Sequence, residues 1–71
     1  MKNSILTKRE KEVFELLILN QTTVEIATKL GISEKTVRNH ISNAMQKLEV
    51  KGRTQAVIEL LKMGEINLED D

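Results

Sequence analysis

The sequence lacks cysteine, proline, tryptophan and tyrosine, and it contains a single aromatic residue, Phe14, and a single histidine, His40. Without cysteine there can be no disulfide, thiolate metal site or cysteine nucleophile. One histidine excludes a metal site built from several histidines. Because Phe14 is the single aromatic residue, the core must be aliphatic. We expect the chain to need no metal, cofactor or small-molecule ligand.

Long apolar runs are also missing. No stretch approaches the roughly 20 apolar residues of a membrane-spanning helix, and residues 1–9 lack the apolar segment of a signal peptide. The 71 residues, of which 39% are hydrophobic and 31% charged, are typical of one small globular domain. We expect a single cytoplasmic domain over residues 1–71, without membrane contact. A domain this short buries little surface, so a dimer or partner would stabilise it.

The charges balance overall but are unevenly distributed. Residues 35–53 hold five basic side chains and one acidic side chain, whereas residues 59–71 hold five acidic side chains and one basic side chain. The first segment could therefore face phosphates, and the second would be repelled by them.

Apolar residues recur at helical spacing, and the alternation typical of strands is absent. The pattern predicts an all-α, compact four-helix domain, ordered over about residues 5–66. The predicted helices span about residues 8–19, 23–30, 34–48 and 53–63. Thr7 and Thr22 are each followed three residues later by a glutamate, which predicts a capping box at the start of the first two helices.

The second and third predicted helices are separated by a very short turn. Gly31 suits a left-handed helix end, and Ser33 is a good N-cap for the third helix. Two helices joined in this way form a helix-turn-helix. Apolar residues stand where that motif needs buried side chains: Ile26, Leu30, Ile32 and Val37.

The third predicted helix has an apolar side and a polar side. At about 100° per residue, its apolar side chains cluster on one side. The other side carries amides, hydroxyls and cations with no carboxylate at its centre: Lys35, Arg38, Asn39, Ser42, Asn43, Gln46 and Lys47. Such groups read base edges and bind phosphates. The alternative interpretation is a solvated face that happens to lack acidic residues.

His40 lies at the border of the apolar side, where a packed, hydrogen-bonded structural histidine is the favoured interpretation and a phosphate contact the alternative. A catalytic role would require an orienting carboxylate and a nucleophile, and the sequence offers no such set. A four-helix domain of this size also has little room for a catalytic pocket. We therefore do not expect an enzyme.

The fourth predicted helix carries more apolar surface than one core needs. Val57 and Leu60 can fill the core, so Ile58 and Leu61 would face away and form a homodimer surface. The alternative is that flanking segments fold back over this helix. Those segments carry Ile5, Leu6, Ile66 and Leu68.

Several segments resemble the LuxR/FixJ-type family of DNA-binding domains. The similarity begins at residues 6–13 and continues in order through 25–27, 32–33, 36–41 and 47–48, so that it covers about residues 5–64. Within that family, residues 33–48 and 63–65 look most like a free-standing sporulation regulator. The resemblance implies a transcription factor whose third helix enters the major groove and whose fourth helix dimerises.

The resemblance also implies site residues. The family's base-contact positions correspond to Arg38, Asn39 and Ser42, with Asn43 beside them on the same face. Backbone contacts are expected from the Ser33 cap, Lys35 and Thr36. The nearby cations extend the expected phosphate-binding set to Lys47, Lys51 and Arg53.

Two positions depart from the family pattern. Glu49 stands where a glycine or asparagine often ends the third helix, which predicts a less sharply capped end. Gly52 stands where an asparagine or serine commonly caps the fourth helix, and glycine costs only a few tenths of a kcal/mol at that position.

The leading hypothesis is a dimeric transcription regulator that binds double-stranded DNA at the nucleoid and contacts RNA polymerase through another surface. The alternative is a protein-interaction adaptor, because promoter-recognition domains of sigma factors share the Arg- and Glu-rich first helix and the same turn. Such an adaptor would not read bases.

Overall fold

The computed structural model describes residues 5–67, which form helices and no strands. The helices are α1 (Lys8–Leu17), α2 (Thr23–Leu30), α3 (Glu34–Leu48) and α4 (Arg53–Lys62). The predicted all-α, four-helix architecture is confirmed. No helix in the described range is long and apolar enough to cross a bilayer. Residues 1–4 and 68–71, including most of the expected tails and the acidic residues 69–71, lie outside the described residues.

The start of α1 is as predicted, but its end differs. The Glu10 N–H donates to Thr7 Oγ1 at 3.1 Å and the Thr7 N–H donates to Glu10 Oε1 at 2.9 Å, which completes the capping box. The helix ends at Leu17 rather than near Leu19. The reason is Asn20, which adopts a left-handed conformation with φ +66°, and asparagine tolerates this conformation better than most residues.

The helix-turn-helix is formed as predicted. Thr22 and Glu25 make the second capping box, Gly31 ends α2 with φ +70°, and the Ser33 side chain caps α3. The turn between α2 and α3 is short because Gly31 reverses the chain in a conformation that only glycine adopts without strain.

The connection between α3 and α4 contains Glu49 and Gly52, the two residues that depart from the family pattern. Glu49 ends α3 in a left-handed conformation, φ +57°, and its N–H donates to the Gln46 carbonyl at 3.2 Å. The end of α3 is thus formed despite the missing glycine. Gly52 supplies no side-chain hydrogen bond to the start of α4. That helix ends at Lys62, one residue before the predicted end.

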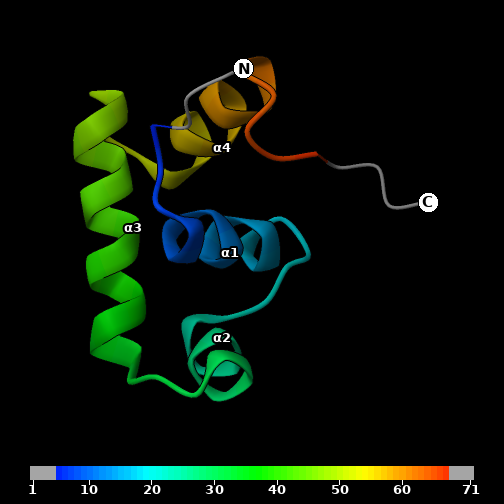
Figure 1. Ribbon diagram of the computed structural model, residues 1–71, viewed down its shortest axis with the longest axis vertical. Helices are drawn as coiled ribbons and strands as arrows, with labels where there is room; N and C mark the ends of the chain where they lie inside the picture. Colours follow the sequence, from blue (N-terminus) through cyan, green and yellow to red (C-terminus); the bar gives the residue numbers. More distant parts are fainter. Residues whose placement is uncertain (1–4, 68–71) are drawn as a thin grey trace.

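α3 lies along one side of the molecule, and α4, α1 and α2 are stacked one above the other beside it (Figure 1). It packs against each of these three helices. The core between them is almost wholly aliphatic, and Phe14, its one aromatic residue, is fully buried. Leu6 before α1 and Ile66 after α4 are also buried in this core. Ile5 and Ile58 stay exposed, so the expected covering of the fourth helix by the flanking segments is not established.

Candidate nucleic-acid interface

α3 has one face in the core and one face in solvent. Val37, Ile41 and Ala44 are buried against the other helices. The four expected base-contact residues are all exposed on the opposite face: Arg38, Asn39, Ser42 and Asn43. Residues three and four apart on a helix are neighbours, so these side chains form one continuous surface, which we call the α3 outer face. Gln46 extends it toward the end of the helix.

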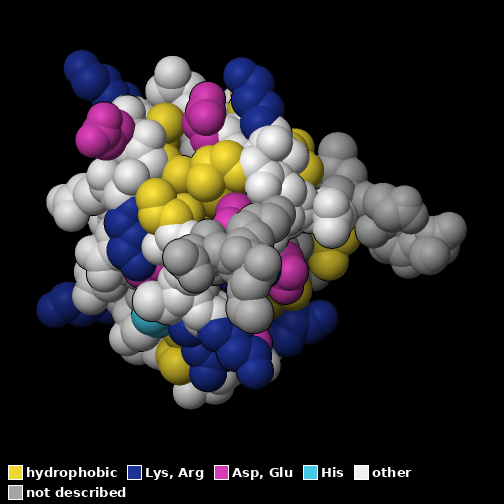
Figure 2. Space-filling model, turned by 45° about the horizontal axis from the view of Figure 1, so that its top comes forward, with side chains coloured by type: hydrophobic (Ala, Val, Ile, Leu, Met, Phe, Trp, Pro, Cys, Tyr) yellow, Lys and Arg dark blue, Asp and Glu magenta, His cyan; other side chains and the backbone are white. Residues whose placement is uncertain are grey.

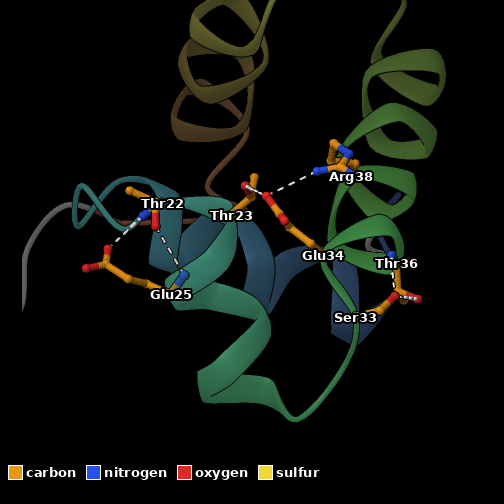
Figure 3. Close-up of polar contacts among 7 residues, drawn as sticks. All are labelled: Thr22, Thr23, Glu25, Ser33, Glu34, Thr36 and Arg38. Atoms are coloured by element: carbon orange, nitrogen blue, oxygen red, sulfur yellow. Dashed lines mark hydrogen bonds and ion pairs between the residues drawn. The ribbon is translucent and has the colours of Figure 1, made fainter.

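The start of α3 is held by two hydroxyl groups. The Thr36 N–H donates to Ser33 Oγ at 3.0 Å, and the Ser33 and Thr36 hydroxyl oxygens are 2.9 Å apart (Figure 3). Both residues therefore stabilise the end of α3 that is expected to lie near the DNA backbone. A helix N-terminus with its free N–H groups favours negatively charged groups such as phosphates.

One polar cluster at the start of α3 was not expected from the sequence. The Thr23 hydroxyl, on the first residue of α2, donates to Glu34 Oε2 at 2.7 Å. Arg38 Nη1 lies 3.1 Å from the same oxygen and forms an ion pair with it (Figure 3). The spacing between Glu34 and Arg38 is compatible with this pair, but the third member comes from another helix and has no local signal in the sequence.

A second unexpected pair lies near the other end of α3. Lys47 Nζ is 2.7 Å from Glu10 Oε1, and the Glu10 side chain is only 5% exposed. Burial by itself would raise the pKa of Glu10, but the hydrogen bonds from Lys47 and from the Thr7 N–H more than offset it, so the pKa is lowered. Lys47, an expected phosphate contact, is thus also a structural link between α3 and α1.

Three other expected phosphate contacts are exposed and form no ion pair within residues 5–67: Lys35, Lys51 and Arg53. Lys35 lies on α3, and the other two flank Gly52 at the start of α4. Unlike Lys47, these three residues have no partner in this part of the chain that a polyanion would have to displace.

His40 is half-buried at the edge of α3, as expected, but its side chain forms no hydrogen bond within residues 5–67. The expected hydrogen-bonded structural role is therefore only half correct.

The apolar surface of α4 is only partly covered. Ala56 and Leu60 are fully buried, Val57 and Leu61 are half-buried, and Ile58 is 46% exposed. A shallow groove runs between α4 and the end of α1, lined by Leu17, Ile18, Arg53, Thr54, Val57 and Leu61. On the face that brings the α4 end forward, hydrophobic side chains gather at the surface between charged ones (Figure 2). The expected contribution of Leu68 lies outside the described residues.

Comparisons with known proteins match this geometry to a family. The model of bacterial regulatory proteins of the luxR family matches residues 4–60. The chain belongs to the luxR family. It is therefore a DNA-binding transcription regulator, and the predicted fold class and family are both confirmed.

Two GerE proteins are similar over nearly their whole length. The chain is 75% identical over 64 residues to the spore germination protein GerE of Bacillus subtilis, covering 90% of this chain and 86% of that protein. A solved structure of the transcription factor GerE superposes with a TM-score of 0.91 at 57% identity, covering 94% of this chain and 100% of that one.

A luxR-family relative of different length shows the same domain. The transcriptional regulatory protein DegU of Brevibacillus brevis is 52% identical over 60 residues, which is 84% of this chain and 25% of DegU. The domain described here thus corresponds to about a quarter of that larger regulator.

Proposed function

We propose that the α3 outer face lies in the major groove of double-stranded DNA and reads its sequence. Arg38, Asn39, Ser42 and Asn43 would contact bases, since arginine pairs with guanine and asparagine with adenine in that groove. The observation that carries this proposal is the exposure of all four side chains on a helix whose opposite face is buried in the core. No part of residues 5–67 covers this face.

Phosphate contacts would position the helix. Lys35, Lys51 and Arg53 would supply cations that form no ion pair within residues 5–67, and Ser33 with Thr36 would present the start of α3 to the backbone. The Lys47 ammonium group already donates to Glu10, so a phosphate would have to share it with that carboxylate. We therefore assign it a mixed role and regard Lys35 as the clearer phosphate contact.

The regulator would act as a homodimer through α4. Ile58 and Leu61, with the groove beside the end of α1, leave apolar surface that a second copy could cover. Two copies would present two outer faces to successive half-sites of an operator. Light scattering after size exclusion, at high micromolar concentration, should report a dimer, and Ile58→Asp should shift it to monomer. A wild-type monomer would contradict this assembly.

The biological setting follows from the relatives. The similarity to a spore germination protein supports a role in a sporulation programme. We propose that the chain acts in the cytoplasm at the nucleoid and contacts RNA polymerase through a surface other than the α3 outer face. No catalytic activity is proposed.

A gel shift with selection from a randomised duplex pool tests the proposal directly. At low salt the wild-type chain should shift random duplex weakly, because phosphate contacts alone supply non-specific binding, and should enrich a preferred site. Lys35→Ala should weaken this non-specific shift, because it removes a proposed phosphate contact. Lys62→Ala, which removes an exposed charge on α4, is its charge-matched control. The adaptor alternative predicts no shift of any duplex, and that result would overturn the proposed function.

A further inference from the structure

Arg38, the expected guanine reader, does not stand alone on the outer face. Its Nη1 lies 3.1 Å from Glu34 Oε2, and the same oxygen accepts a 2.7 Å hydrogen bond from the Thr23 hydroxyl (Figure 3). The Arg38 and Glu34 side chains are 54% and 40% exposed, so both reach solvent where DNA would lie. The first residue of α2 is thus connected to Arg38 on α3 through one carboxylate.

This connection restricts the directions in which the guanidinium can point. An arginine side chain loses much rotational freedom when it is ordered, and an unrestrained one reaches phosphates as readily as bases. The ion pair involves Nη1, and guanidinium carries five N–H donors. Donors therefore remain for the O6 and N7 acceptors of guanine while Glu34 holds the group from behind.

We infer that Glu34 and Thr23 are positioning residues that determine how selectively Arg38 reads its base. The inference rests on the proposed major-groove placement of α3. The Thr23 hydroxyl orients the Glu34 carboxylate, and the carboxylate directs Arg38 toward a base edge and away from the phosphates. The negative charge of Glu34 also weakens non-specific attraction to DNA, so the pair raises selectivity from both directions.

The test measures the ratio of affinities for the site selected by the wild-type chain and for random duplex. Thr23→Val removes only the hydroxyl donor and Glu34→Asp shortens the carboxylate by one methylene while keeping its charge. Each should lower the ratio about two- to fivefold, since an exposed pair at this helical spacing is a modest interaction. Thr23→Ser, which keeps the hydroxyl, is the matched control and should preserve the ratio.

Two further readouts separate positioning from a general structural effect. In an Arg38→Ala background neither Thr23→Val nor Glu34→Asp should change the ratio. In Thr23→Val and Glu34→Asp with Arg38 intact, the released arginine should bind one more phosphate. The salt dependence of non-specific binding should then steepen by up to about 0.9 in log–log slope, the value of one extra phosphate contact. Thermal melts of each variant confirm that the domain stays folded at the binding temperature.

The outcomes distinguish failure of the positioning role from failure of the proposed sequence-specific DNA binding. If the wild-type chain selects no site, the proposed function fails and the inference falls with it. If the wild type selects a site but Thr23→Val and Glu34→Asp leave its ratio unchanged, only the positioning role is overturned. An equal fall in the Arg38→Ala background would also overturn it, because Glu34 would then act without Arg38.

Discussion

Replacing Lys47 with methionine should destabilise the domain, because the substitution leaves the Glu10 carboxylate without its cationic partner. The Glu10 side chain is 5% exposed, and its remaining neighbour on Oε1 is the Thr7 N–H at 2.9 Å. Removing one member of a fully buried pair costs about 3–5 kcal/mol. The Lys47 side chain is 36% exposed, and water screens such a pair, so we expect a loss of about 2 kcal/mol.

That loss is large for this chain. A domain of this length has a free energy of unfolding of about 4–10 kcal/mol. A loss of about 2 kcal/mol should lower the melting temperature by about 8–16 °C, at about 4–8 °C per kcal/mol for domains of this size. Circular dichroism during heating and during urea titration measures both quantities. Methionine preserves the length of the side chain, so the effect reports the lost charge more than lost packing.

A double-mutant cycle isolates the interaction. Glu10→Gln keeps an oxygen that can accept from Thr7 but removes the buried charge, so the Glu10→Gln, Lys47→Met double variant should be more stable than Lys47→Met alone. Contacting charged residues usually couple by about 0.5–3 kcal/mol. If the two single losses simply add, the Glu10–Lys47 pair contributes no interaction free energy and the reasoning is refuted.

The pH dependence of the free energy of unfolding provides a second, independent test of the Glu10–Lys47 pair. In the wild type the pKa of Glu10 is lowered from 4.5 because the Lys47 and Thr7 hydrogen bonds outweigh burial. Its stabilising contribution is therefore full above about pH 4.5 and is lost as the pH falls through the lowered value. In Lys47→Met burial should dominate and raise the pKa, so stability should instead fall as the pH rises above 4.5. Parallel pH profiles for the two proteins would contradict the proposed electrostatics.

The remaining predictions concern the outer face and the two helix ends. Arg38→Ala should cost about 1–3 kcal/mol of specific binding and relax the preference at one base pair in a selection experiment; unchanged site preference would show that the helix register in the groove is wrong. Lys35→Ala should weaken binding to all duplexes alike and reduce the salt slope by about 0.9 in titrations where Lys62→Ala has little effect. Glu49→Gly should stabilise the domain by about 0.5–1 kcal/mol, because φ is +57° there and glycine avoids the left-handed strain, whereas a gain with Glu49→Gln would point to charge instead. Gly52→Ser should add a few tenths of a kcal/mol in urea titrations by supplying the missing cap, and Gly52→Ala should not reproduce this gain.

The helix ends could be predicted because their signals are local. Thr7 and Thr22 with their glutamates, Gly31 and Ser33 act over three or four residues, and each behaves as its sequence context predicts. The early end of α1 was missed because Asn20 stops the helix in a left-handed conformation. An asparagine after an apolar run is a weaker stop signal than a glycine, and the apolar residues before it continue the helical pattern.

The polar contacts that hold α3 could not be predicted in the same way. Glu10 was expected to cap α1, and its position in the capping box gives no sign that its carboxylate is buried or that it meets a lysine 37 positions away. Likewise, the pattern around α3 placed Glu34 away from the centre of the outer face, but Thr23 belongs to another helix. Both contacts depend on how helices pack, which the periodicity of one helix does not determine.

These two contacts hold α3 in a defined position and rotation relative to α1 and α2. Apolar packing is not directional, so Val37, Ile41 and Ala44 alone would tolerate small rotations and shifts of α3. Glu34 and Lys47, about 20 Å apart at 1.5 Å per residue, bind α3 to α2 at one end and to α1 at the other. Directional bonds at both ends fix the rotation of the helix about its axis. In the proposed major-groove placement, the outer face would therefore meet DNA in one orientation, and loosening both ends should reduce sequence discrimination more than the sum of the single changes.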